Sequence, residues 1–192
     1  VVRLEDIAEI IRPQNIRPAQ GDASELFSEV VVGDIPDGGF ICIQKEKKER
    51  KRVDKIDVPK ARRSLLKPYD ILLSIKGNTG IVGVMGDKIP ENSIANQMFT
   101  ILRLHKDPKN NAVYLYMYLK SSLAQTVLNH VTIKGTTLDS IPAQALADLK
   151  IPVLSEEQKN KMFRSFENIG VLCDRVNSIK KEISDKFDDF VM

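Results

Sequence analysis

The side chains best suited to chemistry in this chain are basic, and many of them fall in one segment. Between Lys45 and Arg63 there are ten Lys or Arg and four Asp or Glu, out of 29 and 26 in the whole chain, whose net charge is +3. This local excess favours a polyanionic partner, although a solvated loop is the simpler alternative. Duplex DNA is such a partner, since cations contact its phosphates. The candidate DNA contacts of this segment are Lys47, Lys48, Arg50, Lys51, Arg52, Arg62 and Arg63.

Other candidates for DNA contact lie on short turns and loops. The amides of Asn96 and Gln97 suit the edge of adenine, and the N–H and hydroxyl donors of the Gly135-Thr-Thr loop suit phosphate oxygens. Each group also has a structural alternative, because Gly77 and Gly80 can serve only to shape a tight turn, and an amide at the start of a strand can cap the backbone. These candidates are Lys76, Asn78, Thr79, Gln97, Lys134, Thr136 and Thr137.

A catalytic alternative rests on carboxylates. Asp37 after Pro36, followed at a distance by Glu46-Lys47-Lys48, superficially fits the Pro-Asp…Glu-x-Lys pattern of metal-dependent nucleases, in which two acids hold Mg²⁺. Asp37, however, lies in an Asp-Gly-Gly turn, and Glu46 lies in a charged run where such a triplet arises easily. The sequence also lacks a Gly-rich phosphate loop before a helix, a zinc-type Cys/His spacing and an adenine-methyltransferase motif. We therefore expect no catalytic residue, metal or cofactor, and any chemistry to belong to a partner.

Strands must hold the polar turns in place. Two β-branched runs, 71–75 and 81–84, flank the turn 76–80, and this pattern predicts a hairpin. A third run at 98–104 predicts three consecutive strands of a buried antiparallel sheet. The other predicted elements are strands at 28–32 and 40–43, a helical turn followed by a strand over 4–11, and a helix over 112–129. The predicted fold class is α+β, with a mixed, mainly antiparallel sheet.

A long coiled-coil helix is predicted at the end of the chain. Ser155-Glu156-Glu157-Gln158 forms a capping box, and no Pro interrupts the apolar heptad frame that follows. Gly170 is the one weak point, costing about 1 kcal/mol relative to Ala. A helix over 156–190 extends roughly 50 Å, so we expect it to project and pair with a second helix; folding back on its own sheet is the alternative. The predicted partner-facing residues are Met162, Phe166, Ile169, Cys173, Val176, Ile183, Phe187 and Phe190.

The composition is that of an ordinary globular protein. The 192 residues are 42% hydrophobic, and no stretch has the apolar length that a membrane span needs. The chain opens with Val1 rather than an initiator Met, so we expect it to be a piece of a longer protein. Cys42 and Cys173 lie far apart amid apolar neighbours, which suits reduced core thiols and a cytoplasmic location.

Five motifs follow one another along the chain. They are Asp70-Ile-Leu-Leu-Ser-Ile-Lys-Gly-Asn-Thr-Gly, Asn96-Gln97 at the start of a strand, Tyr114-Leu-Tyr-Met-Tyr-Leu-Lys-Ser, Gly135-Thr-Thr, and Ile151-Pro-Val-Leu-Ser-Glu-Glu-Gln. Singly each is weak, but the ordered set resembles the DNA-specificity (S) subunits of type I restriction–modification systems over nearly the whole chain. In that family a target recognition domain binds one half of a split DNA sequence. A long helix then packs against its counterpart from a second half, and methyltransferase subunits dock on the assembly.

The resemblance implies a function and partners. Residues 1–154 are expected to form a target recognition domain that binds duplex DNA sequence-specifically, and 155–192 a spacer and dimerisation helix. The implied partners are a second recognition half or a second copy, a methyltransferase subunit and, in systems that have one, a restriction subunit, with no membrane. Because full-length S subunits carry two halves, this chain resembles a half-length subunit, a fragment of a two-domain subunit or the specificity tail of a fused adenine methyltransferase. A coiled-coil protein-interaction domain remains a further alternative.

Overall fold

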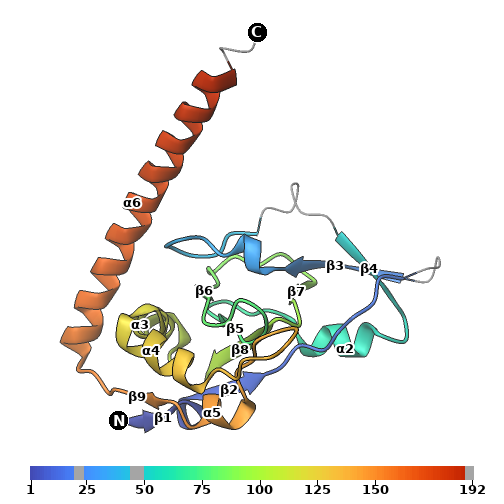
Figure 1. Ribbon diagram of the computed structural model, residues 1–192, viewed down its shortest axis with the longest axis horizontal. Coiled ribbons are helices and arrows are strands. Elements are labelled where there is room, and N and C mark those ends of the chain that lie inside the picture. Colours follow the sequence, from blue (N-terminus) through green and yellow to red (C-terminus); the bar gives the residue numbers. More distant parts are fainter. Residues whose placement is uncertain (20–23, 44–49, 189–192) are drawn as a thin grey trace.

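The molecule has two parts, a mixed α/β domain and a long helix, α6 (Glu156–Asp188), that leaves it (Figure 1). The computed structural model describes residues 1–19, 24–43 and 50–188. The domain contains two main sheets, one of them entirely antiparallel, and helix α3 (Pro108–Lys120) packs against this sheet and against the first half of α6 (Figure 1). The predicted fold class is confirmed.

The framework of the domain is a four-stranded antiparallel sheet. β5 (Ile71–Ser74) lies between β6 (Val82–Val84) and β8 (Phe99–Leu104), and β2 (Ala8–Ile11) pairs with the far side of β8. In this register Ile71 faces Val84 on one side and Leu102 on the other. The predicted hairpin and its third strand are confirmed, and the turn 76–80 joins two fully buried strands.

A second sheet carries part of the basic segment. β3 (Ser24–Val30) pairs antiparallel with β4 (Arg50–Asp54) and parallel with β7 (Ser93–Ala95). β7 is absent from the predicted elements, because three residues are too few to show an alternating pattern. The strand predicted at 28–32 begins earlier than expected, and the one at 40–43 is reduced to a single bridged residue.

The helix predicted over 112–129 is in fact two helices. α3 (Pro108–Lys120) and α4 (Ser122–Val131) meet at Ser121, whose backbone is extended with φ −65° and ψ 150°. The Ser121 hydroxyl accepts a hydrogen bond from the N–H of Ala124 at 3.3 Å, so it caps α4. The prediction of one helix was wrong because the apolar spacing continues through the break.

Short elements complete the domain. β1 (Val2–Arg3) pairs with β9 (Lys150–Ile151), which brings the start of the chain beside the segment that leads into α6 (Figure 1). The other short elements are α1 (Leu4–Ile7), the 3₁₀ helix η1 (Val32–Asp34), α2 (Val58–Arg63) and α5 (Ala143–Ala147). Since α1 leads directly into β2, the helical turn and strand predicted over 4–11 are confirmed.

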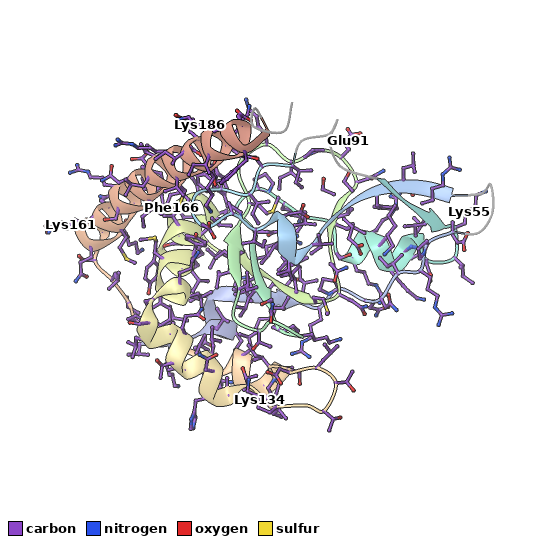
Figure 2. All side chains as sticks on the ribbon, turned by 45° about the horizontal axis from the view of Figure 1, so that its top comes forward. Lys55, Glu91, Lys134, Lys161, Phe166 and Lys186 are labelled. Carbon is purple, nitrogen blue, oxygen red and sulfur yellow. The ribbon has the colours of Figure 1, made fainter. Side chains whose placement is uncertain are left out.

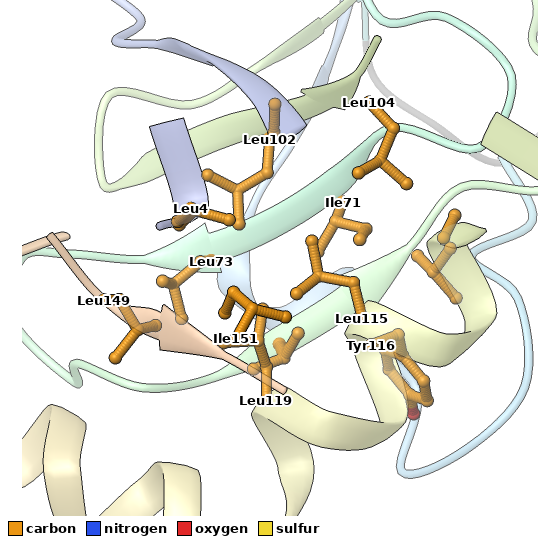
Figure 3. Packing of buried hydrophobic residues seen from close by; sticks show 14 of the residues in the cluster. Leu4, Ile71, Leu73, Leu102, Leu104, Leu115, Tyr116, Leu119, Leu149 and Ile151 are labelled. Carbon is orange, nitrogen blue, oxygen red and sulfur yellow. The ribbon is translucent and has the colours of Figure 1, made fainter. Parts of the chain in front are cut away.

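The main core lies between the antiparallel sheet and α3. Figure 3 shows Leu115 and Leu119 of α3 beside Ile71 and Leu73 of β5. Truncating a side chain in such a core to Ala costs about 2–5 kcal/mol, so this packing holds the hairpin rigidly. The same buried cluster includes Leu4, Leu102, Leu149 and Ile151.

A buried ion pair ties the start of β5 to β8. Asp70 is 1% exposed, and Arg103 donates to it from Nε at 2.9 Å and from Nη2 at 2.7 Å. The backbone N–H of Lys67 also donates to the Asp70 carboxylate, and Arg103 Nη2 donates to the carbonyl of Leu65. Burial raises the pKa of Asp70, and the hydrogen bonds from Arg103 oppose that rise. The pair therefore anchors the link between α2 and the central hairpin.

Helix α6 begins with the predicted capping box and has two different halves. The N–H of Ser155 donates to Oε1 of Gln158 at 2.9 Å, and the N–H of Gln158 donates back to the Ser155 hydroxyl at 3.3 Å. The first half packs against α3, where Phe166 is 2% exposed, whereas residues 174–187 are all exposed. The second half of α6 therefore projects, as predicted, whereas the first half packs against its own domain, which was the alternative. Among the helices of the described residues, none is long and apolar enough to cross a membrane.

Candidate nucleic-acid interface

Residues 50–63 of the basic segment, here called the basic edge, contain the outer strand β4 of the second sheet and helix α2. Val53 of β4 is buried against Phe27 and Ala61, so the alternation of the strand turns Arg52 to the surface. Arg63, at the end of α2, is also exposed. Within the part of the chain that the structure describes, neither arginine side chain has an ion-pair partner. Both are therefore free to meet a phosphate.

Two of the predicted cations of the basic segment are already paired. Lys51 Nζ lies 3.2 Å from Oε1 of Glu29, and each side chain is 19% exposed. Arg62 Nη2 lies 3.1 Å from Oε1 of Glu25, with 60% of the Arg62 side chain exposed. Because β3 supplies both carboxylates, it neutralises part of the charge of its neighbours. Of the other predicted contacts, Lys47 and Lys48 lie outside the described residues, and Arg50 lies in β4 with a side chain that is not described.

The turn 76–80 is held rigidly. Gly77 and Gly80 have φ of +70° and +86°, values that favour glycine. Ser74 donates from its hydroxyl to the carbonyl of Asn78 at 2.5 Å and accepts from the N–H of Ile81 at 2.8 Å. The structural role of both glycines is thus real, and Lys76, Asn78 and Thr79 stand on a fixed turn, with Lys76 and Asn78 exposed.

A second loop, 132–140, packs beside this turn. The N–H of Gly77 donates to the carbonyl of Asp139 at 3.0 Å, and the hydroxyls of Thr79 and Thr132 lie 3.4 Å apart. Lys134 Nζ lies 2.6 Å from Oδ2 of Asp139, and its hydrogen bond lowers the pKa of that carboxyl. Thr136 and Thr137, in the same loop, are exposed. The structure therefore brings together six predicted residues that are far apart in sequence.

Gln97 lies next to this pair of loops. The side-chain oxygen of its neighbour Asn96 accepts a hydrogen bond from the N–H of Met98 at 2.9 Å. Asn96 therefore caps the backbone, which was the structural alternative to reading a base. Met98 in turn accepts from the N–H of Ile75, at the base of the turn. Gln97 is half-buried, and no hydrogen bond of its side chain is formed with the described residues. We call the turn 76–80, Gln97 and the loop 132–140 the tip group.

The tip group and the basic edge are separate. Figure 2 places Lys134, in the tip group, and Lys55, beyond β4, on different protrusions of the domain. Both lie away from α6, which carries Lys161 and Lys186 (Figure 2). The residues 96–98 connect β7 of the second sheet to β8 of the first, so Gln97 stands where the two sheets join. Sequence reasoning passed over Asp139, because a carboxylate five residues after Lys134 follows no motif.

The helix residues predicted to face a partner divide in the same way as the helix. Phe166 packs within its own domain, so its placement at a partner interface is wrong. Met162, Ile169 and Cys173 are half-buried. Val176, Ile183 and Phe187 are exposed, and Phe190 lies outside the described residues. Leu172 and Ile179, which the strict heptad frame omits, are exposed beside them.

The catalytic alternative gains no support from the geometry. The carbonyl of Asp37 accepts from Lys120 Nζ at 2.8 Å, and Glu46 lies outside the described residues. Across residues 1–19, 24–43 and 50–188, no three His, Cys, Asp or Glu side chains are grouped as metal ligands. Cys173 is half-buried but Cys42 is exposed, so the expectation of two core thiols was wrong for Cys42.

The solved structures that match this chain agree on a fold. No family model matches the sequence, and no curated protein matches it. Among solved structures, the S subunit of a type I restriction–modification system from M. genitalium has a TM-score of 0.56 and 20% identity, over 96% of this chain and 42% of that one. The HsdS subunit from Thermoanaerobacter tengcongensis has a TM-score of 0.54 and 15% identity, over 93% and 38%. A chain from work on complex assembly and conformational transition of the type I R-M system has a TM-score of 0.59 and 16% identity, over 96% and 41%.

The matched chains are much longer than this one. The chain spans about two fifths of the length of the three matched structures. The match nevertheless includes nearly all of this chain, and so both the sheet domain and α6. The chain therefore shares its fold with part of the S subunits of type I restriction–modification systems.

Proposed function

We propose that this chain is a sequence-specific recognition module for duplex DNA in a type I-like restriction–modification system. The observation that carries the proposal is the arrangement of exposed polar groups. The tip group and the basic edge stand on a rigid scaffold away from α6, in a chain with the S-subunit fold. Residues 1–154 would then recognise DNA, and residues 155–192 would join the module to a second half.

The two polar groups suit different parts of a duplex. Arg52 and Arg63 are exposed and unpaired within the described chain, so they suit phosphates, whose contacts set register rather than sequence. The tip group carries the amides of Asn78 and Gln97 and the hydroxyls of Thr79, Thr136 and Thr137, and side chains of these types read base edges in the major groove. Specificity would come from the tip group, and affinity from the basic edge.

The projecting half of α6 suits a second helix. Leu172, Val176, Ile179, Ile183 and Phe187 are each at least 46% exposed, and they recur at intervals of three or four residues. Such a stripe on an otherwise polar helix is buried in coiled coils. A second recognition half, in the same protein or in a second copy, would cover it. We propose that the chain itself is not catalytic and that a methyltransferase subunit supplies the reaction.

The test is selection of the purified chain against a randomised duplex pool at moderate salt. Enrichment of one short motif supports the proposal, and the same motif in inverted repeat across a fixed gap supports pairing of two copies. Retention without enrichment would mean that the chain binds only phosphates, and no retention would favour a protein-interaction role. Cleavage of the pool that depends on divalent metal would instead revive the nuclease alternative.

A matched pair of variants separates the two contact types. Arg52→Ala with Arg63→Ala should weaken binding to all sequences and lower the salt dependence by about two counterions, because each phosphate contact contributes one. The control is Arg164→Ala with Arg175→Ala, which removes the same charge from the exposed face of α6. Equal losses in both double variants would contradict the assignment of the basic edge.

A further inference from the structure

Residues 36–40, here called the glycine loop, lie against the first half of α6. A Cβ atom on Gly38 would lie 2.6 Å from Cγ2 of Ile169, a branched atom attached close to the helix backbone. Gly39 has φ of +83°, and its Cα lies 3.9 Å from the position of a Cβ on Gly170. The loop reaches the helix this closely only because residue 38 has no side chain.

Aromatic rings fill the space beside this contact. Phe40 of the glycine loop meets Phe166 edge-on, with ring centroids 4.8 Å apart, and Phe166 meets Tyr116 of α3 at 5.5 Å. Lys120, also on α3, donates to the carbonyl of Asp37 at 2.8 Å and lies over the Tyr116 ring. The glycine loop is thus fixed to α3 and α6 at once.

The contact between the glycine loop and α6 lies just before the point at which the helix stops packing against the domain. Beyond Cys173, which is half-buried, every side chain from Asp174 to Phe187 is exposed. The direction of the projecting half is therefore determined by what holds the residues around Gly170. A glycine inside a helix is unfavourable on its own, and here it lies against Gly39 of the glycine loop.

We propose that the glycine loop is a positioning contact: it fixes the direction in which α6 leaves the recognition domain. In a paired molecule this direction sets the gap between the two DNA half-sites. The statement about direction stands on the contacts alone, whereas the statement about the gap rests on the proposed function. Gly38→Ala should lift the loop from Ile169 and change the direction of the helix.

The direction of α6 relative to the domain is measured as the distance between two nitroxide labels by double electron–electron resonance. A ketone-bearing amino acid that replaces Lys55 and Lys186 carries the labels, so both native cysteines are kept, and excess unlabelled protein suppresses distances between copies. The parent chain should give one narrow distribution. Gly38→Ala should shift or broaden it, and so should Lys120→Ala, which removes the hydrogen bond to Asp37 without adding atoms.

Gly33→Ala is the matched control, because a Cβ atom on Gly33 would meet no atom within 4 Å. It should leave the distribution unchanged. Variants are compared only where circular dichroism shows a folded chain, and Lys120→Ala serves if Gly38→Ala does not fold. An unchanged distribution in the folded variants overturns the positioning role.

The gap is tested with duplexes in which two selected half-sites are separated by increasing numbers of base pairs. Gly38→Ala should bind a single half-site as the parent does but lose at least about tenfold of the preference for one gap, because simultaneous engagement depends on geometry. Equal weakening at every gap would indicate general destabilisation and overturn the inference. If no duplex motif is selected at all, the proposed function fails, while the label distances still decide the direction.

Discussion

Replacing Arg103 by Met should destabilise the domain far more than replacing Arg62 by Met, although each change removes one Arg–carboxylate pair. Asp70, the partner of Arg103, is 1% exposed, whereas Glu25, the partner of Arg62, is 31% exposed. The two variants therefore form a matched comparison of a buried and a surface ion pair in one protein.

The magnitude follows from what each variant leaves behind. Without Arg103 the Asp70 carboxylate loses two hydrogen bonds and keeps only the one from the N–H of Lys67, at 2.7 Å, while the carbonyl of Leu65 also loses its donor. Breaking a buried pair in this way costs about 3–5 kcal/mol. Loss of the exposed Arg62 pair costs about 0–1 kcal/mol, because water solvates both partners.

The cost at Arg103 should also depend on pH. Burial raises the pKa of Asp70, and removal of Arg103 removes the main opposing influence, so the pKa rises further. The folded variant then holds a proton at pH values where the unfolded chain has released it. A folded state that binds more protons gains stability as the pH falls, so the deficit of Arg103→Met should shrink on acidification.

Urea unfolding of the parent chain and both variants at each pH measures these free energies. Arg62→Met should follow the parent at all pH values. A deficit below about 1 kcal/mol for Arg103→Met, or one that grows on acidification, would refute the view that Asp70 is a buried carboxylate held by Arg103.

Three other perturbations test separate parts of the molecule. Burial raises the pKa of Tyr114 to about 12; because the unfolded chain releases this proton near pH 10, the parent should lose up to about 2.7 kcal/mol between pH 10 and pH 12. Tyr114→Phe should remove the part of this loss of stability that is due to Tyr114, and urea unfolding at alkaline pH measures it. Ile183→Lys, at an exposed position of α6, should reduce self-association in sedimentation without changing the unfolding midpoint of the domain; an unchanged association constant would place the partner elsewhere. Gly170→Ala should raise the free energy of unfolding by about 1 kcal/mol, because its Cβ would meet Gly39 at an ordinary 3.9 Å; a loss of stability would mean that the contact is tighter.

Local patterns were enough to predict the elements that depend on their own neighbours. The hairpin around 76–80 follows from β-branched runs and two glycines, and the start of α6 follows from the Ser155 box. The break at Ser121 depends on one hydroxyl that caps α4 inside an unbroken apolar spacing, so periodicity could not reveal it. The meeting of the turn 76–80 with the loop 132–140 depends on contacts between distant segments, which no local spacing encodes.

The same dependence on distant segments limits what the sequence can predict about the charge available for DNA binding. Counting cations between Lys45 and Arg63 correctly marks a basic region, but it cannot tell that Glu25 and Glu29 of β3 lie opposite Arg62 and Lys51. Those carboxylates come from a strand more than twenty residues away and leave fewer free cations than the sequence suggests. A phosphate backbone placed there must either compete with β3 for Arg62 or rely on the unpaired arginines. Because paired cations release few counterions on binding, the salt dependence should be smaller than the number of basic residues in the segment implies.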